Sequence, residues 1–453
     1  MAPLTDGKVS RRLIGFLLPI LAGNLLQQLY NSIDAVIIGR YVGEHALGSV
    51  GVSQPIVGII IALLIGLGAG TEILIGRAIG REDGAEVKRT VDTLFTSIML
   101  LSVVLAAVGY FATPFLLSAI RTPPEQMEGA VLYLKFIFLG IPGIAGYNTL
   151  GGMIRATGNS RTPLFFLVWC SILNGVLDLY AIKKLGMGVE GAAIATAVAQ
   201  TLSFLLCLAY VNRRSRHMRY NPLRLDFSWA TLRQGMRCAL PVSIQQGAMS
   251  VGALLLQVVV NGLGGAAVTA ATIGGRIDSF AALPIIGIGQ GLSVFTSQNM
   301  GAGRSDRVRE AKRITLLWTY CIGALLLVLL WGFGGEMARF FGATGITVKM
   351  TEDYVRILSL GYFAAGYFTV IQGLIRGTGN TFAPMVITIA GFWAVRLPAA
   401  ALLSIPLGYL GVWLSILVSW ATTYLMTLIY YHSKGFQRAL RLAGAEGETI
   451  NES

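Results

Sequence analysis

The sequence predicts an all-α integral membrane protein that crosses the bilayer with twelve helices, arranged as two parallel repeats of six. Three observations support this fold class: the composition, the number of long apolar segments, and a motif that occurs twice. Hydrophobic residues make up 54% of the 453 residues and charged residues only 13%, and the mean hydropathy is +0.68. Because a soluble domain carries about 25% charged residues, we expect this chain to lie in lipid.

Twelve apolar segments are long enough to cross a bilayer, which takes about 20 residues in a helix. They are residues 13–39, 46–76, 91–113, 130–154, 162–182, 188–211, 238–260, 266–297, 314–335, 353–375, 382–404 and 408–431. We expect the first to be a retained helix rather than a signal peptide, because it is long and lacks a small-residue cleavage site. Most of the 35 lysines and arginines face the cytoplasm if both termini lie there, so the positive-inside bias predicts cytoplasmic termini.

The motif that occurs twice is "GMIRATGNSRTP" at 152–163 and "GLIRGTGNTFAP" at 373–384, at an offset of 221 residues. An even number of spans separates the two copies, so the halves are predicted to share one orientation, as in parallel transporter repeats. The predicted domains are an N-lobe at 1–211, a basic linker at 212–237, a C-lobe at 238–431 and a cytoplasmic tail at 432–453. The motif itself is expected to be structural. Gly and Asn tolerate left-handed backbone, Pro opens the next helix, and Arg155 is placed to cap the preceding one.

Several classes of function are disfavoured. The four cysteines, at 170, 207, 238 and 321, lack paired spacing, so neither a disulfide framework nor a zinc site is predicted. The net charge of +13 is explained by orientation in the membrane, and no nucleic-acid partner is expected. The glycine run "GLGAGTEILIG" lies in an apolar helix, which argues against dinucleotide binding. No nucleophile or cofactor loop emerges, so the sequence predicts neither an enzyme nor a cofactor.

Two aspartates in the first half of the chain lie well inside predicted spans, where ionisable groups are costly and usually functional. Asp34 and Asp178 lie at similar depth in the first half of the chain, and Asn174 is one helical turn before Asp178. Two carboxylates with an amide could share a proton or bind a small cation. The alternative is that each aspartate bonds a neighbouring helix or faces water. Glu72, in contrast, is expected to reach Arg77 and the cytoplasmic solvent.

The second half lacks this acidic cluster, because the offset carries Asn174 and Asp178 onto Val395 and Ala399. Its membrane charges include Asp278 and Arg396, which lie at comparable depth. A buried arginine is expected to have a partner, so we predict an ion pair between them, whose role the sequence leaves open between structure and function.

Polar and aromatic residues within the spans predict an interior cavity suited to large organic cations, through charge and cation–π contacts. The residues proposed to line it are Gln28, Tyr30, Gln54, Tyr147, Gln245, Asp278 and Arg396. Pro19, more than one turn inside the first span, is predicted to be a hinge because proline removes a helix hydrogen bond.

The twelve spans, the two halves, the doubled "IRATGN"/"IRGTGN" motif and the N-x-x-x-D at 174–178 resemble the multidrug and toxic compound extrusion (MATE) family. The resemblance implies a V-shaped pair of lobes that exports drugs and other organic cations in exchange for H⁺ or Na⁺ by alternating access. It also implies a multi-pass protein of the cell membrane, here expected to be a monomer.

The chain is most similar to the DinF-like branch of that family, which assigns ion coupling to an N-lobe cluster. The matching positions here are Asp34, Asn148, Asn174, Asp178 and Thr196. The NorM-like branch also places acids in the C-lobe, but the corresponding sites near Met249 and Ala365 are not acidic. A C-lobe Na⁺ site of that kind is therefore not expected, and the choice between H⁺ and Na⁺ stays open.

The alternative function is a flippase or exporter of a lipid-linked oligosaccharide or another amphipathic anionic substrate. Such proteins usually have extra spans and several basic residues in the cavity. The interior here offers mainly Arg276 and Arg396 against three aspartates, so cation export is favoured.

Overall fold

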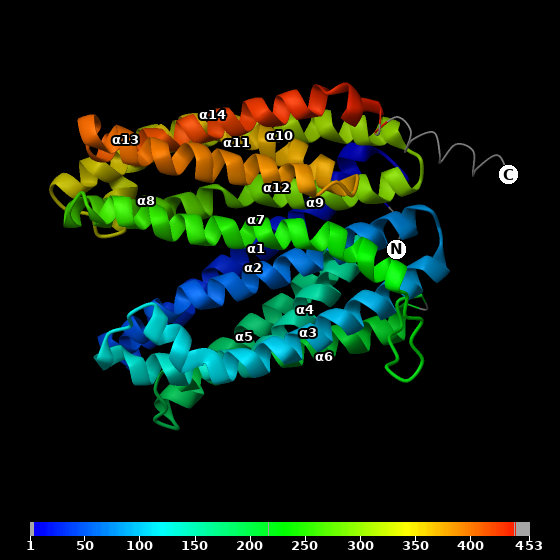
Figure 1. The fold of residues 1–453 in the computed structure, drawn as a ribbon, viewed down its shortest axis with the longest axis horizontal. Helices are drawn as coiled ribbons and strands as arrows, with labels where there is room; N and C mark the ends of the chain where they lie inside the picture. Colours follow the sequence, from blue (N-terminus) through cyan, green and yellow to red (C-terminus); the bar gives the residue numbers. More distant parts are fainter. Residues whose placement is uncertain (1–3, 216, 439, 441–453) are drawn as a thin grey trace. The chain divides into compact units, whose positions relative to one another are not determined.

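The computed structural model describes residues 4–215, 217–438 and 440, without the side chains of residues 31, 35, 44, 45 and 47. These described residues form helices and connecting turns, with no strand (Figure 1). The helices are α1 Val9–Tyr41, α2 Glu44–Gly80, α3 Gly84–Ala119, α4 Pro124–Ala156, α5 Arg161–Lys183, α6 Val189–Arg214, α7 Trp229–Asn261, α8 Gly265–Ala281, α9 Leu283–Gly301, α10 Ser305–Phe340, α11 Ile346–Gly377, α12 Phe382–Ile389, the π-helix η1 Ala390–Arg396, α13 Leu397–Leu407 and α14 Tyr409–His432.

The prediction of twelve spans is confirmed, with one of them bent. Eleven helical segments in the described chain are long and apolar enough to cross a membrane, and α12, η1 and α13 together make one of them. The twelfth is the pair α8 and α9, which meet at an angle of 43°. Pro284 lies in the first turn of α9, where a proline is tolerated because it needs no backbone N–H donor. The bend therefore coincides with a residue that cannot continue the preceding helix.

The chain folds into two compact units. Unit 1 is Leu18–Gly247, and unit 2 is Leu4–Leu17 together with the described residues from Ala248 onward. Each of α1 and α7 thus contributes its first part to one unit and its remainder to the other. The lobe limits predicted from the sequence stay a prediction.

In unit 1 the repeated motif caps α5 and ties it to α6. Gly158 has φ +82°, a left-handed conformation that glycine adopts without a steric penalty. The side chain of Asn159, one residue before the N-cap Ser160, accepts a hydrogen bond from the Thr162 backbone nitrogen in the first turn of α5 at 3.1 Å. Its amide donates to the hydroxyl of Tyr210 on α6 at 3.4 Å.

The second copy does the same in unit 2. Gly379 has φ +79°, and Asn380 accepts from the Ala383 backbone nitrogen at 3.2 Å. Its amide donates to Tyr430 on α14 at 2.6 Å. The motif is therefore a capping turn that fastens the fifth span of each repeat to the sixth.

The first part of α7 packs closely on α2 within unit 1. A methyl group added at Gly66 would lie 2.3 Å from the backbone nitrogen of Ser243, and one at Gly70 would lie 2.8 Å from that of Ala239. The Ser243 hydroxyl donates to the Leu63 carbonyl at 3.0 Å. Small residues thus let the two helix backbones touch, as is common between transmembrane helices.

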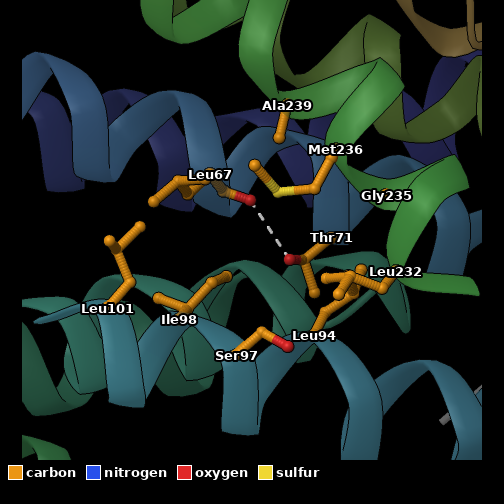
Figure 2. A pocket seen from close by; sticks show the side chains of 10 residues that line it. All are labelled: Leu67, Thr71, Leu94, Ser97, Ile98, Leu101, Leu232, Gly235, Met236 and Ala239. Carbon is orange, nitrogen blue, oxygen red and sulfur yellow. Dashed lines mark hydrogen bonds between the residues drawn. The ribbon is translucent and has the colours of Figure 1, made fainter. Parts of the chain in front are cut away.

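Beside this contact, α2, α3 and α7 enclose a small apolar cavity of about 30 Å³. Figure 2 shows Leu67 and Thr71 of α2 facing it, with Thr71 donating its hydroxyl to the Leu67 carbonyl. A volume of this size holds one or two waters at most. It is a packing defect and not a site for a drug-sized molecule.

Candidate ion-binding site

Unit 1 brings together four polar residues that the sequence nominated from three different spans. Asp34 on α1 and Asp178 on α5 lie close enough for their carboxyl groups to interact. Asn174 and Asp178 are one turn apart on the same face of α5, and both are fully buried. The expectation that the two carboxyl groups meet is therefore matched by their positions in the fold.

Hydrogen bonds hold the helices around this pair. The Asn174 amide donates to the Thr196 hydroxyl on α6 at 3.2 Å. The hydroxyl groups of Tyr30 on α1 and Thr196 are 3.3 Å apart and share a hydrogen bond. Thr196 thus links α1 and α5 through a single side chain, and it places the amide of Asn174 beside the acids.

The site is rich in hydrogen-bond acceptors that have no donor. Among the described residues, no donor reaches Asp34 Oδ1, Asn174 Oδ1 or either carboxyl oxygen of Asp178. Burying an acceptor without a partner costs about 1–3 kcal/mol. Four such oxygens in one place call for a positive species, either a proton shared by the acids or a small cation.

The described part of the chain does not supply that charge. None of the ion pairs found among the described residues involves Asp34 or Asp178. The same part of the chain contains no group of three or more His, Cys, Asp or Glu side chains that could hold a metal ion. The possible ligands are two carboxylates, one amide oxygen and one hydroxyl, a set of hard oxygen donors that suits a proton or a group I cation rather than zinc or copper.

Three further residues that the sequence did not single out lie beside the acids or one helical turn from a proposed ligand. Tyr133 on α4 interacts electrostatically with both aspartates. Cys170, one turn before Asn174, interacts with Ser203 and with Asp34. Gln200, one turn after Thr196, is buried with an unpaired side-chain oxygen. The four-residue spacing along α5 and α6 was the available signal for Cys170 and Gln200; no local signal marks Tyr133.

Asn148 is placed differently from the other proposed ligands. Its amide donates to the Ile144 carbonyl in its own helix at 2.8 Å rather than to the acid pair. The Tyr147 hydroxyl donates to the Pro163 carbonyl at 3.2 Å, which adds a further tie between α4 and the start of α5.

The glutamines proposed to line a cavity differ in exposure. Gln28 is half-buried and Gln54 exposed, whereas Gln245 is buried. Their contact with a substrate stays a prediction, as does the role of Pro19, which lies inside α1 two residues after the change of unit.

In unit 2, Asp278 takes a hydrogen bond from a tyrosine rather than from an arginine. The Tyr362 hydroxyl donates to Asp278 Oδ1 at 2.8 Å. Arg396, at the end of η1, lies over the ring of Phe392 at 5.0 Å and interacts with Asp278 only through its charge. The predicted direct ion pair is therefore not formed, and the hydrogen-bond donor to the carboxylate is the Tyr362 hydroxyl of α11 instead.

Glu72 also has a different partner from the one expected. It accepts a hydrogen bond from Arg155 Nε at 3.0 Å, with 16% of its side chain exposed. Arg155 belongs to the repeated motif, so this copy of the motif fixes α2 to α4 as well as capping a helix. Arg77 was the expected partner because it lies on the same helix as Glu72, whereas Arg155 comes from α4.

Known proteins resemble this chain along almost its whole length. The MatE family model matches residues 19–180 and again 241–402, so both repeats fit one model. The probable multidrug resistance protein YpnP of Bacillus subtilis is 29% identical, over 97% of this chain and 98% of its own. The probable multidrug resistance protein NorM of Thermotoga maritima is 26% identical, over 95% and 94%. A crystal structure of MATE in the bent conformation superposes with a TM-score of 0.88 at 24% identity, covering 99% and 98%.

Proposed function

Because this chain belongs to the multidrug and toxic compound extrusion (MATE) family, a family of membrane transporters rather than enzymes, we propose that it exports drug-like organic cations in exchange for H⁺ or Na⁺. The protein is a multi-pass membrane protein. Its relatives in Bacillus subtilis and Thermotoga maritima are named probable multidrug resistance proteins. The observation that carries the ion-coupling proposal is the buried acid pair of unit 1, with its unpaired acceptor oxygens.

The coupling ion binds between Asp34 and Asp178. A proton would bridge the two carboxyl groups, and Na⁺ would take their oxygens together with those of Asn174 and Thr196. In both cases the ion adds one positive charge to a site that otherwise holds two negative ones. The hydroxyl and amide then keep the helices in place while the charge changes.

The exported cation is released because the ion weakens its attraction to the acids. Two opposite unit charges 4 Å apart attract by about 4 kcal/mol at an effective dielectric constant of about 20. Neutralising one carboxylate removes an attraction of this size, which corresponds to about a thousandfold in affinity. The ion and the cargo therefore compete for one negative site without having to touch the same atoms.

Transport in everted membrane vesicles tests this function. Ethidium transport by the parent protein should follow an imposed pH or Na⁺ gradient, and Asp178→Asn should reduce it to background. The matched control is Asp306→Asn, because Asp306 is 65% exposed and its ion pair among the described residues is with Arg304 at the start of α10. This variant should transport at the parental rate. Parental transport by Asp178→Asn would disprove the coupling role.

The same assay separates cation export from export of an anionic lipid-linked substrate. Arg396→Gln should disturb ethidium transport only modestly. An anionic substrate would instead depend on this arginine, so loss of anion export together with unchanged ethidium transport would favour the alternative function.

A further inference from the structure

The short segment that precedes α1 is held in unit 2 by α9. The Leu4 backbone nitrogen donates to the Gln298 side-chain oxygen at 2.9 Å. The Asn299 amide lies 3.5 Å from the Leu4 carbonyl and 2.8 Å from that of Phe295. Leu4 is only 3% exposed, so the first described residue of the chain is buried and bonded through its backbone.

Arg307 on α10 completes this attachment. Its guanidinium donates to the carbonyls of Gly7 at 2.7 Å, Leu4 at 3.1 Å and Asp6 at 3.4 Å. Its Nε donates to Asn299 Oδ1 at 2.9 Å. An arginine presents five donors in a fixed plane, and here most of them bind the backbone of one segment. Gly7, at φ +75°, lets the chain curl so that its carbonyls face the guanidinium.

We name this set, residues 4–7 with Gln298, Asn299 and Arg307, the N-terminal clasp. Arg307 is 6% exposed, and its bonds go to carbonyl and amide oxygens rather than to a carboxylate. The bonds depend on backbone atoms of residues 4–7, so they resist changes in the side chains of that segment. A buried arginine used in this way indicates an attachment of the chain and not a surface charge.

The clasp lies at the start of the helix that carries a coupling acid. α1 belongs to unit 2 through Leu17 and to unit 1 from Leu18. Pro19 follows at once and cannot donate to the Gly15 carbonyl one turn earlier, where the space beside Gly15 is open. Asp34 lies further along the same helix. α1 is therefore fixed at one end in unit 2, weakened at the change of unit, and bears the acid in unit 1.

The second repeat has an equivalent attachment of different chemistry. The segment before α7 is held in unit 1 by α3. The Asp226 backbone nitrogen donates to Asp92 Oδ2 at 3.0 Å, and that of Ser228 donates to the Thr93 hydroxyl at 3.0 Å. α7 then passes into unit 2 after Gly247. The segment before α7 is thus held by a carboxylate and a hydroxyl, whereas the segment before α1 is held by a guanidinium and two amides. The two repeats share the attachment of the segment but not its chemistry.

We propose that Arg307 is a positioning residue for transport, which fixes the segment before α1 to unit 2 so that a change at Asp34 is transmitted to that unit. This proposal rests on the ion-coupling role proposed above for Asp34. Without the clasp, α1 could bend or shift at Pro19 when the ion binds while unit 2 stays as it was. Cargo and ion would still bind, but their binding would no longer drive the transport step.

Cysteine labelling tests the clasp directly, without any transport measurement. The background carries Cys321→Ser, because Cys321 is exposed while the three other cysteines are buried. In everted vesicles, Leu4→Cys should react slowly with a water-soluble maleimide and react about tenfold faster when Arg307→Gln is added. Arg307→Lys, which keeps the charge but loses the planar fork, should give an intermediate rate. Equal labelling with and without Arg307 would disprove the clasp.

Transport by the same variants, in the native Leu4 and Cys321 background, tests the positioning role. Arg307→Gln should lower kcat for ethidium about tenfold and leave KM within about twofold, because binding groups are untouched. A variant that lacks residues 4–7 but keeps Arg307 should show the same change, which rules out a simple folding defect of the substitution. Arg309→Gln, two residues away and exposed, is the matched control and should behave as the parent.

The outcomes distinguish this proposal from the proposed function. Unchanged kcat in both the Arg307→Gln variant and the deletion would overturn the positioning role even if labelling increased. If the parent itself does not transport ethidium against either gradient, the proposed function fails, and the positioning role fails with it. The labelling rates then still decide whether the clasp exists.

Discussion

Replacing Asp178 by asparagine should stabilise the protein, although the ion-coupling role proposed above predicts that the same change abolishes transport. Both carboxyl oxygens of Asp178 are buried without a donor, as are Asp34 Oδ1 and Asn174 Oδ1. An asparagine amide brings two N–H donors to this group and removes one buried charge. Each acceptor that gains a partner recovers about 1–3 kcal/mol. One new bond would therefore raise Tm by about 2–12 °C, at about 2–4 °C per kcal/mol for a unit of this size.

A second fully buried aspartate provides the matched control, because its replacement by asparagine should lower the stability rather than raise it. Asp92 is also 0% exposed, but both its oxygens accept from Lys88 Nζ, at 2.5 and 2.6 Å, and one accepts from the Asp226 backbone nitrogen at 3.0 Å. Asp92→Asn removes the charge that these donors require, so it should lower the stability by about 1–3 kcal/mol. The same chemical change thus has opposite effects at a satisfied and an unsatisfied site.

The measurement is thermal unfolding of the purified protein in detergent, followed with a dye that becomes fluorescent on reacting with cysteine thiols. The three buried cysteines report unfolding, and Cys321→Ser removes the exposed one from the background. If Asp178→Asn lowers Tm as much as Asp92→Asn does, the carboxylate of Asp178 has partners that stabilise it. The idea of an ion site left open by the chain would then be wrong.

Two further predictions concern packing and the inner ion pair. Gly66→Ala should lower the free energy of unfolding by about 1–3 kcal/mol, because the new methyl group meets the backbone of α7 at 2.3 Å. The control variant Gly58→Ala, whose methyl group meets nothing within 4 Å, should match the parent. Equal Tm values for the two variants would contradict the close contact between α2 and α7. Arg155→Gln should destabilise the protein by about 1–3 kcal/mol, because it leaves Glu72 largely buried without its cation. Adding Glu72→Gln should recover most of this loss. Additive losses in this double-mutant cycle would show that the two side chains are not coupled.

The sequence by itself determined the membrane class, the number of spans and the repeat. These properties depend on local runs of apolar residues and on a motif copied at a fixed spacing, both of which are visible without any knowledge of contacts. The repeated turn was also assigned correctly to a structural role, because the capping bonds of Asn159 and Asn380 reach only three residues ahead. Asp34 and Asp178 stood out because a charge within an apolar segment is costly wherever its helix packs.

Tertiary structure alone decided which partner each buried polar group has. Arg307 was one of many basic residues at the end of a span, and only the fold places it against the carbonyls of residues 4–7, about 300 positions earlier in the chain. Tyr362 replaced Arg396 as the hydrogen-bond donor to Asp278, and Arg155 replaced Arg77 as the partner of Glu72. Insertion into a membrane depends on the composition of each segment, which is a property of the sequence. Pairing depends on which helices meet and at what height, and that is set by the packing of all the helices together.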